Sequence, residues 1–157
     1  MVLIIIAGIL TAIVVPQFAD HTSEARLATL DADLTAVRNS IELYYHQHNA
    51  VYPGAVDSSD PAQPSASHEE DFLRQLTLYT DISGRTSPTG DPRTFRFGPY
   101  LRKLELPANP FTGTATLVAD LTTASQSTSA SDGTSAWKFV VKTGRFIAND
   151  DAAHATR

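Results

Sequence analysis

The first nineteen residues carry no charge, and this feature constrains the chain more than any other. Ten of the fourteen residues from Val2 to Val15 are Val, Leu or Ile, and Asp20 is the first charged residue. Such a composition favours insertion into a bilayer. Eighteen helical residues span about 27 Å, slightly less than the roughly 30 Å of a hydrocarbon core. We therefore expect residues 1–19 to be a helix segment that is buried by lipid, by other subunits, or by both in turn.

A cleaved secretory signal is disfavoured at this end of the chain. Val14, Val15, Pro16 and Gln17 stand where a cleavage site needs small residues, and no basic residue precedes the apolar run. The apolar segment is therefore expected to begin upstream of Met1.

Downstream, apolar residues recur at spacings of three and four, which is typical of one face of an α-helix. We call these residues the head-packing stripe: Leu27, Leu30, Leu34, Val37, Ile41 and Tyr44. The stripe predicts a helix over residues 20–48 that covers the core of its own domain, with a coiled coil as the alternative. Intervening charged residues such as Arg38 and Glu42 are expected to meet solvent. Pro16 should kink or loosen the long helix without ending it.

Strand signals come late, so the sequence predicts an α+β fold in which the amphipathic half of the helix packs on a small antiparallel sheet. Candidate strands are residues 115–121, 137–142 and 145–148, and the last two are expected to form a hairpin across Thr143-Gly144. A globular head would then occupy residues 20–149, followed by a flexible, frayed tail at 150–157.

Two short helical pieces are also expected. Ser67 and Glu70 fit a capping box that opens a helix through Leu76, and Pro99 is placed to begin a single turn. Residues 84–92 read as a loop. Residues 122–135 contain nine Ser or Thr, which predicts a mobile surface loop or, alternatively, a glycosylated patch.

Composition excludes several functions. The net charge of −5 and the lack of a basic stripe argue against nucleic-acid binding, and no basic cluster suits anionic lipid heads. There is no cysteine, so the chain has no disulfide and no thiolate metal site. Stability must come from packing or from assembly with other copies.

Catalytic and metal-binding motifs are not found. His46 and His48 stand two apart, so they point to different sides of a helix and are expected at its solvated end. Phosphate loops, nucleophile elbows and zinc motifs are absent from the sequence. We therefore expect no enzymatic activity and no cofactor.

The run AGILTAIVVPQF, followed by a long amphipathic helix, resembles type IV pilins and the pseudopilins of type II secretion systems. Tyr52-Pro53, the segment GPYLRKLELPANPFTG from Gly98 to Gly113, and a later Trp-containing strand are most similar to the major pseudopilin. The resemblance is strong over about the first fifty residues and looser beyond. The family's basic leader and mature start would lie before Met1, which agrees with an apolar segment that begins upstream.

The resemblance implies that the apolar half of the helix protrudes and polymerises. The implied polymerisation residues are Leu3, Ile4, Ile5, Ile6, Gly8, Ile9, Leu10, Ile13, Val14, Val15, Pro16 and Phe18. In family filaments this part of the helix is often unwound, and we expect residues 8–16 to lose regular helix in a polymer. Major pseudopilins often bind calcium, for which Asp132, Asp150 and Asp151 are weak candidates because their spacing fits no known loop.

The resemblance further implies a structural role: a homo-oligomeric pseudopilus subunit, held by inner-membrane lipid with its head in the bacterial periplasm before the secretion machinery assembles it. A surface pilin for adhesion, motility or DNA uptake is the first alternative, although many such pilins close a loop with a disulfide. A membrane-tethered ligand-binding module is the second alternative.

Overall fold

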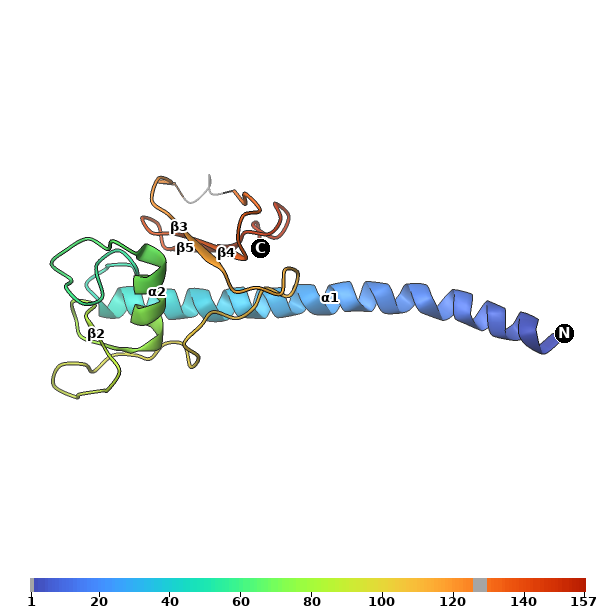
Figure 1. Ribbon diagram of the computed structural model, residues 1–157, viewed down its shortest axis with the longest axis horizontal. Coiled ribbons are helices and arrows are strands. Elements are labelled where there is room, and N and C mark those ends of the chain that lie inside the picture. Colours follow the sequence, from blue (N-terminus) through green and yellow to red (C-terminus); the bar gives the residue numbers. More distant parts are fainter. Residues whose placement is uncertain (1, 126–129) are drawn as a thin grey trace.

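The computed structural model describes the backbone of residues 2–125 and 130–157, and the side chains of residues 22–125 and 130–157. Its longest element is helix α1 (Val2–Gln47), which continues through Pro16. The other elements gather around the C-terminal part of α1, and its N-terminal part extends away from them (Figure 1). At 1.5 Å per residue, the 46 residues of α1 are about 69 Å long.

Helix α2 (His68–Thr77) lies beside the C-terminal part of α1 (Figure 1). It begins where the sequence predicts, but the predicted capping box is wrong. Ser67 is the N-cap residue and makes no side-chain capping bond. Its amide donates to the Ser65 hydroxyl at 3.1 Å, and Glu70 pairs with Arg74 at 3.3 Å. The neighbouring Glu69 accepts a hydrogen bond from the Ala119 amide at 2.9 Å and so ties α2 to the sheet.

The main sheet contains three strands in the order β3 (Leu117–Asp120), β4 (Trp137–Val140) and β5 (Arg145–Ala148). Strands β4 and β5 are antiparallel, which confirms the predicted hairpin. Gly144 has φ +73°, the left-handed conformation that the tight turn needs.

Strands β3 and β4 are parallel, so the prediction of a fully antiparallel sheet is wrong. The Trp137 amide bonds the Thr116 carbonyl at one end of the pair, and the Val141 amide bonds the Asp120 carbonyl at the other. The connection at residues 121–136 therefore carries the chain back to the end of the sheet where β3 began. A long connection of this kind is what parallel pairing requires.

Two further regions differ from expectation. Strands β1 (Tyr79–Thr80) and β2 (Thr86–Ser87) form a small antiparallel pair, and β2 lies within residues 84–92, where a loop was predicted. The single helical turn after Pro99 is not formed. The amides of Tyr100 and Leu101 both donate to the Leu76 carbonyl at 2.9 Å, so this segment binds the end of α2.

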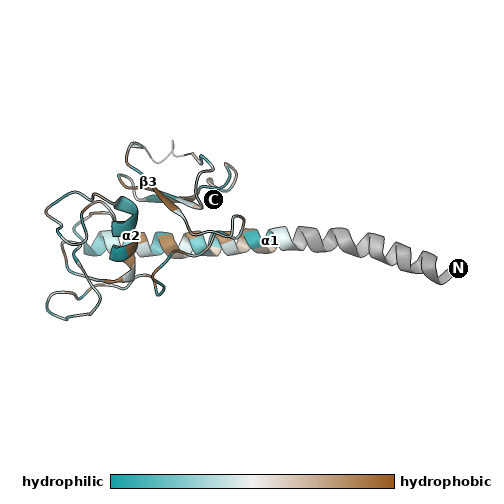
Figure 2. Ribbon diagram, in the orientation of Figure 1, coloured by the Kyte–Doolittle hydropathy of each residue, from teal (hydrophilic) through white to brown (hydrophobic). Residues whose placement is uncertain are grey.

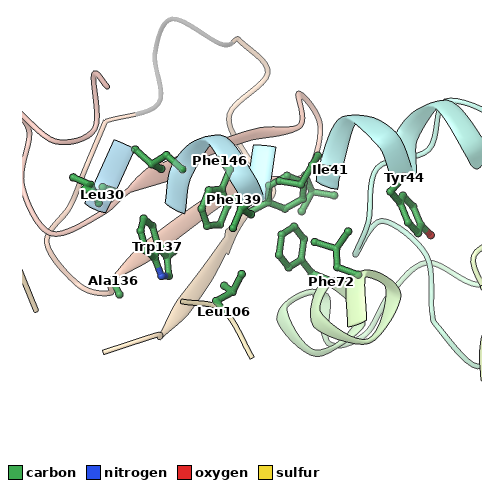
Figure 3. Close-up of a cluster of buried hydrophobic side chains, with 14 residues drawn as sticks. Leu30, Ile41, Tyr44, Phe72, Leu106, Ala136, Trp137, Phe139 and Phe146 are labelled. Carbon is green, nitrogen blue, oxygen red and sulfur yellow. The ribbon is translucent and has the colours of Figure 1, made fainter. Parts of the chain in front are cut away.

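The core lies between α1 and the sheet, with α2 closing one end (Figure 3). Phe139 and Phe146 are cross-strand partners on the same face of the hairpin. Phe72 from α2 meets Phe139 with ring centroids 4.6 Å apart. Figure 2 shows apolar and polar residues alternating along the part of α1 inside the head, as expected for a helix with one buried face.

The C-terminal residues pack against α1, whereas we expected a frayed tail at residues 150–157. Ala155 is buried. The Arg157 side chain pairs with Asp31 at 2.6 Å, and the Arg157 carbonyl oxygen accepts a hydrogen bond from the Arg38 guanidinium at 2.7 Å. These contacts close the head over one side of the helix.

Candidate assembly surface

The implied polymerisation residues, Leu3 to Phe18, lie on the extending part of α1, and their side chains fall outside the described residues. In the single chain, residues 8–16 are helical. The expected unwinding concerns a polymer and stays a prediction. Among the residues whose side chains are described, no helix is both long and apolar enough to span a bilayer. The uncharged residues 1–19 lie outside this part of the chain.

The head-packing stripe lies on the face of α1 that meets the sheet and α2. Leu27 at its start is half-buried. The other members are at most 1% exposed and belong to the main core: Leu30, Leu34, Val37, Ile41 and Tyr44. Because the stripe is occupied by the head of its own chain, it does not offer an apolar surface for a partner.

Arg38 does not face solvent as expected from its place off the stripe. It is half-buried, and its Nε donates to the Phe146 carbonyl at 2.9 Å. Burial and the positive charge of Arg145 lower the pKa of Arg38, and Asp31 partly offsets this. Arg38 thus ties the helix to the hairpin. A long arginine side chain can reach from beside an apolar stripe to a neighbouring element, which a count of helical positions does not reveal.

The expectation of a solvated helix end fails for His48, which is 1% exposed. One ring nitrogen lies 2.8 Å from the Tyr44 carbonyl and the other 2.9 Å from the Thr80 hydroxyl. His46 is exposed, as expected. Thr80 of β1 and the rings of Phe97 and Tyr100 lie against His48, so the two histidines meet different surroundings.

The segment from Gly98 to Gly113, which carries part of the family resemblance, follows the β1–β2 pair in the chain and bonds to both α2 and the main sheet. Asn109 is fully buried, and its amide nitrogen donates to the Ala136 carbonyl at 3.2 Å and to Asp150 at 2.9 Å. The Pro107 carbonyl accepts the indole hydrogen bond of Trp137 at 2.9 Å. This segment therefore has a structural role in the described head.

Each of the three candidate calcium ligands binds a different partner. Asp132 pairs with Lys138 at 2.6 Å and accepts a hydrogen bond from Asn149 at 2.7 Å. Asp150 binds His154 at 2.7 Å. Asp151 accepts a hydrogen bond from a backbone amide at 2.7 Å. Within the described part of the chain, no group of three or more acidic, His or Cys residues is arranged to hold a metal ion.

A shallow groove of about 450 Å³ lies between α1, the β4–β5 hairpin and the C-terminal residues. Its lining includes Arg38, Arg145 and Arg157, together with Glu42. The sequence did not predict this cluster, because its helix members, Arg38 and Glu42, lie more than a hundred positions before Arg145 and Arg157. No short motif signals such an arrangement.

Comparison of the chain with models of protein families, with curated proteins and with solved structures finds no significant match in any of the three. A functional assignment therefore depends on the chain's own residues and geometry.

Proposed function

We propose that this chain is the subunit of a helical filament of the pilus or pseudopilus type, and more specifically a major pseudopilin of a type II secretion-like system. The supporting observation is the division of α1. Its C-terminal part is covered by the head, and its N-terminal part extends away from the head with a sequence that is uncharged through residue 19.

Such a helix needs a second environment for its apolar part. Lipid can supply this environment before assembly, and the equivalent helices of other subunits can supply it afterwards. The subunit leaves the bilayer when helix–helix contacts replace lipid contacts. In this proposal the function is mechanical, and no residue has a catalytic role.

The decisive experiment is electron microscopy of filaments sheared from producing cells, with the subunit identified by mass spectrometry. Envelope-retained protein that forms filaments when overproduced supports the pseudopilin. Long surface fibres built from this chain instead support the surface pilin, and their map also shows whether residues 8–16 unwind. A strictly monomeric membrane protein contradicts both forms of the proposal.

The lack of cysteine permits a sharper test of the interface. A variant with cysteines at two positions of the apolar segment, Ile6→Cys with Ile13→Cys, should give a ladder of covalent multimers on oxidation. Either single variant should stop at dimers. The matched control, Lys142→Cys with Thr112→Cys, places both thiols on the head and should give no ladder. A ladder from the control alone would place the interface on the head.

A further inference from the structure

We propose that two adjoining hollows at one end of the head bind a neutral glycan, with one sugar ring in each hollow. The first hollow measures about 390 Å³, and its lining includes Tyr79, Phe95 and Arg96. The second measures about 270 Å³, and its lining includes Arg96 again, with Leu43 and Tyr100. Because Arg96 lines both hollows, they form one continuous surface. Their size suits small-molecule ligands, whose sites begin at about 300 Å³.

The site lies at the end of the head away from the extending N-terminal part of α1. Leu43 and Gln47, which line the second hollow, belong to the C-terminal end of this helix (Figure 1). All residues that line the two hollows lie at or beyond Leu43 in the chain. The inference is therefore independent of the proposed filament function, which rests on the apolar N-terminal segment.

Aromatic rings provide the apolar part of the surface, and two of them are held in place by the head. Phe97 pairs with Thr80 of β1, and the amide of each donates to the carbonyl of the other, at 3.1 and 2.9 Å. The backbone at Gly90 lies against the Tyr79 ring, since a Cβ atom there would be 2.9 Å from a ring carbon. Tyr79 and Phe97 are only half-buried. Rings fixed in this way can contact the apolar C–H groups of a sugar with little loss of conformational entropy.

The charges in the first hollow are balanced, which favours a ligand without net charge. Asp91 and Arg96 line this hollow together, and neither forms an ion pair with a described residue. A carboxylate only accepts hydrogen bonds and a guanidinium only donates them, whereas a sugar hydroxyl does both. Hydroxyls of one ring can therefore bind Asp91 and Arg96 at once. A charged ligand would be attracted by one of the two and repelled by the other.

The second hollow has the same mixture of apolar and polar groups. Leu43 is 50% exposed and offers an apolar wall. Gln47 accepts the hydrogen bond of the Tyr100 hydroxyl at 2.7 Å, and its amide nitrogen has no partner among the described residues. The Arg96 guanidinium lies 4.9 Å from the centre of the Phe97 ring, and its five N–H groups can serve both hollows. Two sugar rings joined by one glycosidic bond match this arrangement.

The test is an NMR titration of the full chain with two neutral disaccharides, cellobiose and N,N′-diacetylchitobiose. The protein is kept in a polyoxyethylene detergent, which has no sugar head group. The ring signals of Tyr79 and Phe95 report on the first hollow, and those of Tyr100 on the second. We expect saturable shifts with at least one disaccharide and about tenfold weaker binding of its monosaccharide. Because the ligand is neutral, its affinity should not depend on ionic strength.

Variants test the polar contacts. Arg96→Gln should weaken binding about tenfold, because Arg96 lines both hollows. Asp91→Asn should weaken it about fivefold, while the amide oxygen of the new side chain can still accept the bond that Arg93 donates to Asp91 at 2.9 Å. The matched control is Arg93→Gln, which makes the same charge change at an exposed arginine outside both linings and should leave the affinity unchanged. Circular dichroism checks that each variant is folded.

Three outcomes overturn the proposal: no saturable shift with either disaccharide, a monosaccharide that binds as tightly as the disaccharide, or equal weakening by Arg93→Gln and Arg96→Gln. The same ring signals are also followed with an uncharged proline-rich peptide. Shifts with the peptide but with neither sugar would make this surface a protein-binding site instead.

Discussion

Tyr44 and His48 stack face to face one helical turn apart, with ring centroids separated by 3.8 Å and planes inclined by 5°. Both side chains are at most 1% exposed. Burial lowers the pKa of His48, and hydrogen bonding to the Tyr44 carbonyl only partly offsets this. His48, directly after the end of α1, is therefore an uncharged imidazole held between the helix and strand β1.

The stability of the head should fall in mild acid because of His48. In the unfolded chain the imidazole takes up a proton near pH 6.5, whereas in the folded chain it does so only at lower pH. The free energy of unfolding should therefore decrease as the pH falls below about 6.5, by up to about 1.4 kcal/mol per pH unit. Urea unfolding at a series of pH values measures this slope.

The variant His48→Gln should lose most of that slope, although it is also less stable at neutral pH because it disturbs the contact with Thr80. The neighbouring variant His46→Gln is the matched control, since His46 is exposed. An unchanged slope in His48→Gln would show that other groups cause the acid sensitivity.

Gly144 should tolerate no side chain. Its φ of +73° is left-handed, and a Cβ atom would overlap the ring of Tyr52. That ring stacks on Tyr45 at 4.3 Å and cannot move without losing the contact. We expect Gly144→Ala to lower the free energy of unfolding by about 3 kcal/mol, of which about 1–2 kcal/mol is backbone strain.

The control is Gly113→Ala, where φ is +70° and a Cβ atom would meet nothing within 4 Å. This variant should show the backbone cost alone, about 1 kcal/mol. Equal losses for the two variants in chemical denaturation would mean that the Tyr52 overlap relaxes at no cost.

Asp132 should stabilise the head as the counterion of Lys138. The ammonium group of Lys138 is largely buried and lies 2.6 Å from the carboxylate. The bond from Lys138, with those from Thr134 and Asn149, lowers the pKa of Asp132 well below its usual range. Because Asp132 is itself 44% exposed, we expect Asp132→Asn to cost only about 1–2 kcal/mol at pH 7.

The pH dependence of this loss has a definite sign. A carboxyl group with a lowered folded pKa contributes stability above about pH 4, and the contribution disappears as the pH falls further. The difference between wild type and Asp132→Asn should therefore shrink below pH 4. The exposed Asp151→Asn variant should change stability by less than about 0.5 kcal/mol. Addition of calcium or EDTA should leave the melting temperature of all three proteins unchanged.

Phe72 should be the main contribution of α2 to the core. Its ring is fully buried and meets Phe139 at 4.6 Å and Phe146 at 6.2 Å. Phe72→Ala should cost about 3–5 kcal/mol through lost burial and a residual cavity. Leu104→Ala is the comparison, because Leu104 is 74% exposed and should change stability little. A small loss for Phe72→Ala in thermal unfolding would mean that the head does not depend on α2.

Several features of the fold follow from local sequence. The spacing of Leu30, Leu34 and Val37 predicts a helix with one buried face, and these residues are in the core. Thr143-Gly144 between two apolar runs predicts the β4–β5 hairpin. Such signals depend on side-chain periodicity and on the φ preference of single residues, and both are encoded by neighbours in the chain.

Other features depend on which distant segments meet. The parallel pairing of β3 with β4 depends on the path of the connection at residues 121–136, which no turn motif specifies. The burial of His48 depends on Thr80, thirty-two positions away, and the groove around Arg38 depends on Arg145 and Arg157. Local periodicity predicts which face of a helix is apolar. Which polar groups lie beside that face depends on how the whole chain packs. Long-range contacts are chosen by the balance of loop closure, burial and hydrogen bonding over the whole head.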